Sequence, residues 1–253
     1  MARREEGACC RYVTEEQRRR PGCLGREIDR LSHSRALSRR ARRLQWGTAV
    51  SRFARPAPTS VPIHDLLAAR CSSHAFDPEL PVARDDQLAL FEAARWAPSF
   101  QNQQPWRFVV CDRFADPAAW QKAFELVPSR ARPWAHNAAL ILLVCAELAG
   151  LDGREAGPLS RAVYDTGAAA LQLCLEATAR NLAINATHAI DELRLRGAFA
   201  IPESCACLAM LCIGHRADAG TLGRDVYLRE MAARRREPLA ERFFGGSFGV
   251  TGV

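Results

Sequence analysis

The side chains best suited to binding chemistry begin with a polar cluster at residues 70–74, Arg-Cys-Ser-Ser-His, which follows a segment with helical spacing. Arg70 can bind a phosphate through two parallel charge-assisted hydrogen bonds, and Ser72 can add a hydroxyl or amide donor. Taken alone, the cluster is equally consistent with an ordinary polar helix end. A second basic run, Arg234-Arg235-Arg236, is suited to the same phosphate only if the fold brings it to Arg70; otherwise it is a solvated face.

The most informative segment is residues 97–106, with the sequence APSFQNQQPW. Pro98 ends the preceding helix, and Ser99 can cap a turn. Asn102 and Gln104 carry amides that can both donate to and accept from the polar edge of a ring. Because buried amides beside a tryptophan are costly without partners, the segment predicts a loop that covers a ligand or an interface. A solvated turn is the alternative.

Apolar spacing predicts the elements that must position these residues. Helices are expected at residues 63–69, 84–96, 116–126, 160–182 and 189–197. Strands are expected at residues 107–111, 139–146, 184–187 and 205–214. This order favours an α+β fold with a central sheet over a βαβ array.

Two of these helices have an expected buried face. In the helix at residues 84–96 it is marked by Leu88, Phe91 and Ala94 or Arg95. The long helix at residues 160–182 is expected to be the central core helix, and its face is marked by Leu171, Leu175, Thr178 and Leu182.

The positive charge of the chain is concentrated at its start. Residues 1–60 carry 15 arginines and six acidic residues, whereas the rest has a net charge of −2. Such a segment buries too little apolar surface to offset its ordering entropy. We expect a disordered extension over residues 1–60, or a start codon assigned too far upstream, followed by one domain at residues 61–253. The alternative is an arm that binds nucleic acid or a membrane surface, since arginine-rich runs neutralise phosphates.

The ten cysteines fit reduced thiols better than disulfides, because no apolar signal segment follows the first residues. Cys205, Cys207 and Cys212 lie in a continuous apolar run, so we interpret them as buried core residues and expect no metal site. No apolar run reaches the roughly 20 residues of a membrane span. A cytoplasmic protein is expected.

The motifs, in their order and spacing, resemble the nitroreductase family over essentially all of residues 61–253. The resemblance rests on RCSSHAF at residues 70–76, APSFQNQQPW at 97–106, YDTG at 164–167, CIGH at 212–215 and REPL at 236–239. It implies a central mixed or antiparallel sheet flanked by helices, a homodimer, and FMN bound at the dimer interface.

By the same resemblance, the cofactor positions of the family fall on four groups of residues. The FMN phosphate, its ribityl chain and the pyrimidine edge of the ring match Arg70, Cys71, Ser72 and His74. The loop that covers the flavin, often across the dimer interface, matches Pro98, Ser99, Asn102 and Gln104. The backbone that faces flavin N5 matches Ala186, Thr187, His188 and Ala189, and the phosphate is also held by Arg234 and Arg236.

The chain departs from the family pattern at several positions. His74 stands where the family usually has Arg or Lys beside ring atoms N1 and O2, so stabilisation of reduced flavin would depend on the protonation or hydrogen bonding of this imidazole. Ala189 and Asn181 replace frequent glycines, which bears on the backbone path and the redox potential.

The resemblance implies a ping-pong reaction in which NAD(P)H passes a hydride to flavin N5 and a small acceptor, such as a nitroaromatic, quinone or enone, takes the electrons. No catalytic side chain is required. His188 is a candidate proton donor, although a residue that contributes only backbone amides is the simpler interpretation. The alternatives are a nucleic-acid-binding protein that uses the basic arm, and a relative that consumes its flavin or oxidises peptide rings.

Overall fold

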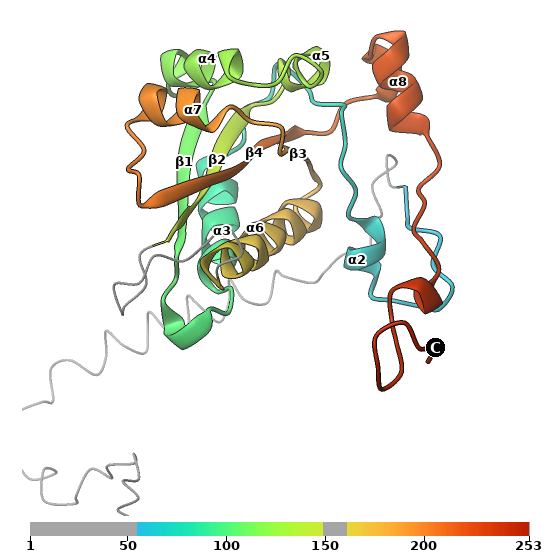
Figure 1. Cartoon of the computed structure of the whole chain (residues 1–253). Helices are drawn as coiled ribbons and strands as arrows, with labels where there is room; N and C mark the ends of the chain where they lie inside the picture. Colours follow the sequence, from blue (N-terminus) through green and yellow to red (C-terminus); the bar gives the residue numbers. More distant parts are fainter. Residues whose placement is uncertain (1–54, 149–160, 253) are drawn as a thin grey trace, which may run out of the picture. The chain divides into compact units, whose positions relative to one another are not determined.

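The computed structural model describes residues 55–148 and 161–252, whose centre is an antiparallel sheet (Figure 1). The sheet contains β1 (Trp106–Asp112), β2 (Leu140–Glu147), β3 (Leu182–Thr187) and β4 (Cys205–His215) in the order β1-β2-β4-β3. All three neighbouring pairs are antiparallel. The predicted α+β class and its strands are confirmed. Apart from residues 55–60, the predicted arginine-rich extension lies outside the described residues.

Both faces of the sheet are buried, and β2 shows why. Its residues alternate between two cores: Ile141, Leu143 and Cys145 face one, and Leu140, Leu142 and Val144 face the other. A strand covered on both sides reads as a continuous apolar run. The register between β2 and β4 shifts after Val144, so that both strands keep their large side chains directed into the two cores.

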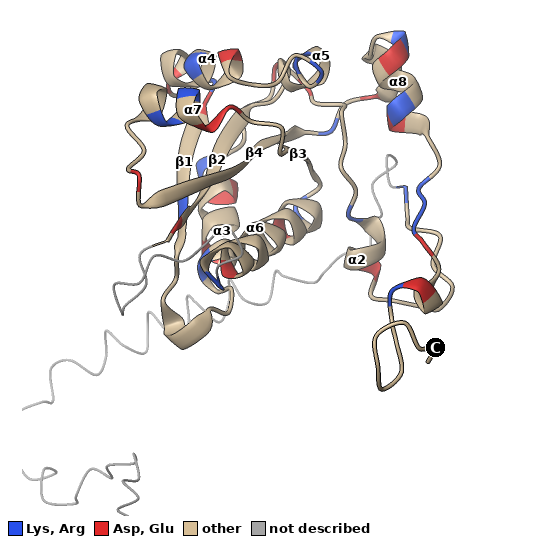
Figure 2. Cartoon of the chain, in the orientation of Figure 1, with Lys and Arg blue, Asp and Glu red and all other residues tan. Residues whose placement is uncertain are grey.

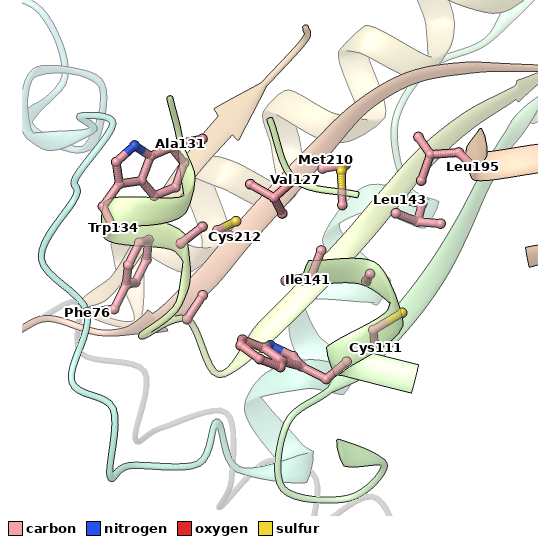
Figure 3. Packing of buried hydrophobic residues seen from close by; sticks show 14 of the residues in the cluster. Phe76, Cys111, Val127, Ala131, Trp134, Ile141, Leu143, Leu195, Met210 and Cys212 are labelled. Carbon is pink, nitrogen blue, oxygen red and sulfur yellow. The ribbon is translucent and has the colours of Figure 1, made fainter. Parts of the chain in front are cut away.

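Helices cover the two faces as separate layers (Figure 1). On one face lie α3 (Arg84–Arg95) and α6 (Arg161–Ala179). The other face is covered by α4 (Pro117–Glu125), α5 (Arg132–Ala135) and α7 (Glu192–Phe199). Figure 3 shows the core on this second face, where Trp134 of α5 packs beside Phe76 and Cys212 of β4 lies near them.

The buried cysteines contribute to this second core as small apolar side chains. Burial raises the pKa of the Cys145 and Cys212 thiols to about 12. The Cys145 and Cys207 sulfur atoms are 4.0 Å apart across strands β2 and β4. Among the described residues, no three histidine, cysteine or acidic side chains are grouped so as to hold a metal ion.

The buried face of each large helix differs in part from the predicted one, although Ala94 is buried and Phe91 packs against the core as predicted. Helix α3 buries Gln87, Leu90 and Ala94, whereas the side chain of Leu88 is 47% exposed. Helix α6 buries the small or compact side chains Ala162, Thr166, Ala169, Leu173 and Ala177, and leaves Leu171 51% exposed. Small residues let α6 approach α3 and the sheet closely, which apolarity alone does not reveal.

The predicted end of the long helix is also wrong. Helix α6 ends at Ala179, because Asn181 adopts a left-handed backbone conformation with φ 58°. Leu182 is therefore the first residue of strand β3 and not the last of the helix, and it is buried in the sheet. The predicted start at Ser160 lies outside the described residues.

The sequence predicted the start of helix α4 correctly, but not the start of α7 or the existence of one further helix. Asp116 caps α4 as expected, accepting a hydrogen bond from the Ala119 amide at 3.0 Å. Helix α7 starts later than predicted because Asp191 caps it. Helices α2 (Asp65–Ala69) and α8 (Arg224–Met231) complete the described part, with no helix in it long and apolar enough to cross a membrane. Helix α8 was not predicted.

Candidate functional site

The polar cluster at residues 70–74 runs beside β3, one of the two edge strands of the sheet. The Ser73 amide donates to the Ile184 carbonyl at 3.1 Å, and the Asn185 side-chain amide donates to the Ser73 carbonyl at 3.0 Å. Asn185 is buried and lies within β3. These bonds bring two of the predicted segments together, namely the polar cluster and the end of β3.

The third predicted segment, the basic run after α8, joins the same place. The Arg234 guanidinium donates to three backbone carbonyls, those of Arg55 at 2.5 Å, Ala68 at 2.8 Å and Arg70 at 2.8 Å. It thereby ties the chain after α8 to helix α2 and its end. Figure 2 shows the basic residues in blue along the segment that follows α8.

Arg234 lies in a concentration of positive charge. Its pKa is lowered first by burial and then by the charges of Arg70, Arg236 and Arg55. No carboxylate in residues 55–148 or 161–252 forms an ion pair with any of these four arginines. A group of guanidinium ions without acidic partners is suited to binding an anion such as a phosphate.

A buried carboxylate, which the sequence did not indicate, lies beside this basic cluster. Glu230 of α8 accepts hydrogen bonds from the Ser73 hydroxyl at 3.0 Å and from the His74 amide at 2.8 Å. The His74 ring atom Nδ1 lies 2.9 Å from the same carboxylate. Burial favours the neutral acid, but hydrogen bonds from His74 and Ser73 outweigh it, so the pKa of Glu230 lies below its usual value.

This lowered pKa predicts that stability depends on pH through Glu230. The contribution is fully present above the ordinary value of 4.5 and is lost as the pH falls through the lower value of the folded state. The difference in unfolding free energy between wild type and Glu230→Gln should therefore shrink on acidification, measured by urea unfolding from about pH 7 to about pH 3. Glu237→Gln, at an exposed glutamate, is the control. If the difference in unfolding free energy between wild type and Glu230→Gln were the same at about pH 3 as at about pH 7, a stabilising Glu230 carboxylate with a lowered pKa would be contradicted.

The amide-rich loop is held in an unusual backbone conformation. Gln101, Asn102 and Gln104 have φ values of 48°, 58° and 48°, in the left-handed region that side chains disfavour. The Ser99 hydroxyl accepts from the Gln104 amide at 3.0 Å, and the Gln104 side chain donates to the Asn102 carbonyl at 3.1 Å. Pro98, Asn102 and Gln104 are exposed. The amides of Asn102 and Gln104 are therefore at the surface of the described chain and are not buried, whereas the prediction of a ligand-covering loop assumes burial.

Asp165 in the first turns of α6 anchors this loop. Its buried carboxylate accepts from the Phe100 amide at 2.9 Å, and the Arg161 guanidinium lies 4.1 Å from the centre of the Phe100 ring. The YDTG motif therefore fixes the loop through the carboxylate of Asp165.

We expect Asp165→Ala to release the loop, because the Phe100 amide loses its acceptor. Hydrogen exchange of that amide should accelerate about tenfold or more, which corresponds to about 1.4 kcal/mol of lost protection. In Asp165→Asn the side-chain carbonyl can still accept a hydrogen bond, so the exchange rate of the Phe100 amide should lie between those of wild type and Asp165→Ala. Tyr164→Phe, at a side chain that is 82% exposed, is the control. Equal exchange in Asp165→Ala and wild type would refute the anchoring role.

The loop and the basic cluster lie apart in one chain. The loop contacts α6 at Asp165, whereas the charge of Arg70 acts on Cys174, nine residues further along the helix. At 1.5 Å per residue this is about 13 Å along the helix axis. Figure 1 shows the segment that joins α3 to β1 and helix α2 on opposite sides of α6.

Comparison with known proteins identifies the fold and the family. The nitroreductase family model matches residues 67–215, from helix α2 to the end of β4. The chain belongs to the nitroreductase family. Of the five motifs that carry the resemblance, those at residues 70–76, 97–106, 164–167 and 212–215 lie within the matched range. The REPL motif at residues 236–239 follows that range.

Individual relatives support the family assignment. An uncharacterised 15.4 kDa protein of Mycolicibacterium smegmatis is 31% identical over 120 residues, which are 47% of this chain and 78% of that protein. A crystal structure described as the oxidoreductase containing FMN is 29% identical with a TM-score of 0.70, over 77% of this chain and 96% of its own. A nitroreductase family protein of Clostridium difficile, 19% identical with a TM-score of 0.57 over 74% of this chain and 99% of its own, shares the fold.

In this nitroreductase fold the predicted positions form two groups. Residues 70–74, the end of β3 and the basic run are assembled in one place, and the loop is at another. At the end of β3, Thr187 is buried whereas His188 and Ala189 are exposed. Glu230 and Asp165 are the residues that sequence reasoning missed as parts of the site. Glu230 stands between the exposed residues Arg229 and Met231, so the pattern gives no signal of its burial.

Proposed function

We propose that this chain binds FMN and acts as an NAD(P)H-dependent oxidoreductase. The observation that carries the proposal is the cluster of Arg55, Arg70, Arg234 and Arg236, which has no acidic partner among the described residues and lies beside the edge strand β3. A dianionic phosphate would neutralise that cluster and accept its hydrogen bonds. The relative described as containing FMN has the same fold with a TM-score of 0.70.

The residues have separate roles in this proposal. Arg70 and Arg236 would bind the phosphate directly, because neither guanidinium ties distant segments together as that of Arg234 does, and Arg236 donates only to the carbonyl of the adjacent Arg235. Arg234 already donates to three carbonyls, so it would contribute its charge and its remaining N–H groups. Cys71 and Ser72 would follow the ribityl chain, and His74 would meet the polar edge of the ring.

The remaining positions would surround the reacting face of the ring. Backbone groups at Ala186, His188 and Ala189, at and just beyond the end of β3, would lie beside flavin N5. When bound, FMN supplies the redox chemistry, accepting a hydride at N5 from NAD(P)H and reducing a small acceptor such as a nitroaromatic, quinone or enone. The chain would position the ring and its substrates and exclude water, and no side chain is required as an acid or base.

The exposed face of α6 supports a homodimer, in which the loop of one chain would cover the flavin of the second copy. Tyr164 and Leu171, two turns apart on one face of α6, are 82% and 51% exposed. An apolar helix face of this kind is suited to contact with a partner.

We therefore expect the full chain to sediment as a dimer, and Leu171→Arg to shift it to the monomer, because a charge would be buried at the interface. Leu193→Arg, at an exposed leucine of α7, should sediment as wild type does. Sedimentation velocity distinguishes these states. A wild-type monomer would argue against a loop contributed by the partner.

The proposed function is tested by absorbance spectroscopy of the full chain. We expect a flavin spectrum after purification or reconstitution with FMN, and bleaching of that spectrum under anaerobic NADPH or NADH. A chain that cannot be reconstituted with FMN would overturn the proposal. Binding without bleaching would keep the cofactor and remove NAD(P)H as donor.

A further inference from the structure

The carboxylate of Glu230 is the acceptor for three donors from two consecutive residues. It bonds the Ser73 hydroxyl through one oxygen, and the amide and ring Nδ1 of His74 through the other, at 3.0, 2.8 and 2.9 Å. The Ser73 hydroxyl oxygen in turn accepts from the Ala75 amide at 3.2 Å. The side chains of Glu230 and His74 are 9% and 20% exposed, so these bonds are shielded from water.

This arrangement determines which ring nitrogen of His74 carries a hydrogen. An ionised carboxylate can only accept, so the ring atom facing it must donate. The neutral imidazole is therefore the form protonated at Nδ1, and Nε2 carries the free lone pair. Through this bond Glu230 selects one of two tautomers that are otherwise close in energy.

The ring is also held on a second side. Trp134 of α5, which is buried, contacts His74 edge to face with ring centres 5.4 Å apart and an angle of 81° between the planes. Trp134 packs in turn on Phe76, at 6.2 Å between ring centres (Figure 3). With Nδ1 on Glu230, Nε2 is the ring nitrogen that no described residue engages.

A structural link alone would not need a carboxylate here. Helix α8 buries only Val226 and Glu230, so an apolar residue at position 230 could attach the helix without the cost of desolvating a charge. Two of the three hydrogen bonds that Glu230 accepts come from His74, one from its backbone amide and one from the ring itself. The carboxylate therefore acts on the orientation of that ring.

We propose that Glu230 is a positioning residue for His74: it fixes the Nδ1-protonated ring and directs Nε2 toward the polar edge of the bound flavin. The flavin part rests on the proposed function. There, Nε2 would accept from a ring N–H when the imidazole is neutral and donate to a ring oxygen or nitrogen when it is protonated. Carboxylates that orient an imidazole in this way are common behind functional histidines.

The positioning is tested first without any cofactor. Long-range ¹⁵N–¹H NMR distinguishes the two tautomers, and a spectrum of His74→Ala assigns the signals of His74 among the six histidines. We expect Nδ1 to carry the hydrogen in neutral wild-type His74, and Glu230→Ala to shift the ring toward the other tautomer. Ser73→Ala removes only the hydrogen bond from the Ser73 hydroxyl to Oε1 of Glu230, so the His74 ring should keep the wild-type tautomer.

The role at the flavin is tested by a double-mutant cycle in the affinity for FMN, followed by quenching of its fluorescence. Glu230→Gln preserves the shape of the side chain and exchanges charge-assisted bonds for weaker neutral ones. It should weaken FMN binding about tenfold in wild type and leave the affinity of His74→Ala unchanged. Equal losses in both backgrounds would show that Glu230 acts independently of His74.

The outcomes separate this inference from the proposed function. Nε2 protonated in wild type, or an unchanged tautomer in Glu230→Ala, would overturn the positioning role whether or not FMN binds. Wild type that binds no FMN but shows the expected tautomers would overturn the proposed function and the flavin part alone. If Glu230→Ala does not fold, the wild-type tautomer and the Glu230→Gln cycle still decide.

Discussion

Arg234→Ala is expected to weaken FMN binding about 100-fold and to lower the free energy of unfolding by about 2 kcal/mol. The substitution removes a charge from the basic cluster and leaves the carbonyls of Arg55, Ala68 and Arg70 without their donor. The carbonyls of Ala68 and Arg70 lie in the segment from which Arg70 would reach the phosphate in the proposed site, so position and charge would be lost together. FMN titration and urea unfolding measure the two effects.

Two variants separate the causes of that loss. Arg235→Ala removes the same charge from the neighbouring exposed residue, and its stability should stay within about 0.5 kcal/mol of wild type. Arg234→Lys keeps the charge but cannot span three carbonyls, so we expect intermediate values for both quantities. If Arg234→Ala retained FMN as wild type does, the phosphate would have to bind elsewhere.

Leu173→Ala is expected to be the most destabilising single change in helix α6, at about 3 kcal/mol. Leu173 is fully buried between α6 and the sheet, in a core that otherwise receives alanines from this helix. Because the alanines cannot expand into the space, a cavity would remain. Thermal and urea unfolding give the measurement.

Leu193→Ala is the matched control, since it is the same substitution at a helical leucine that is 82% exposed. Leu193→Ala should lower the free energy of unfolding by no more than about 0.5 kcal/mol. Similar losses in the two variants would mean that α6 does not bury the face described here. The comparison therefore tests the corrected face directly.

The family of this chain was accessible from sequence because the resemblance depends on residue types in a fixed order. Arg70, the amide-rich loop and the basic run at 234–236 could be recognised without knowing where they meet. The strands were predictable for a related reason, since burial on both faces of a sheet requires unbroken apolar runs such as residues 139–146.

The helix faces could not be obtained in the same way. Pattern analysis places the largest apolar side chains inward, but α6 buries Ala169 and Ala177 and exposes Leu171. Which side of a helix is buried depends on how closely its neighbours approach. That distance is a property of the packed layers and leaves no periodic mark when small residues form the contact.

By itself, the sequence determined the α+β class and the family, because these depend on local pattern and on motif order. Only the tertiary structure decided which residues work together. It joined Glu230 to His74 across 156 positions and Arg234 to Arg70 across 164, and it separated the loop from both. The physical reason is that buried hydrogen bonds and ion clusters form between residues close in space, and distance in space is set by the packing of the whole sheet and its helices.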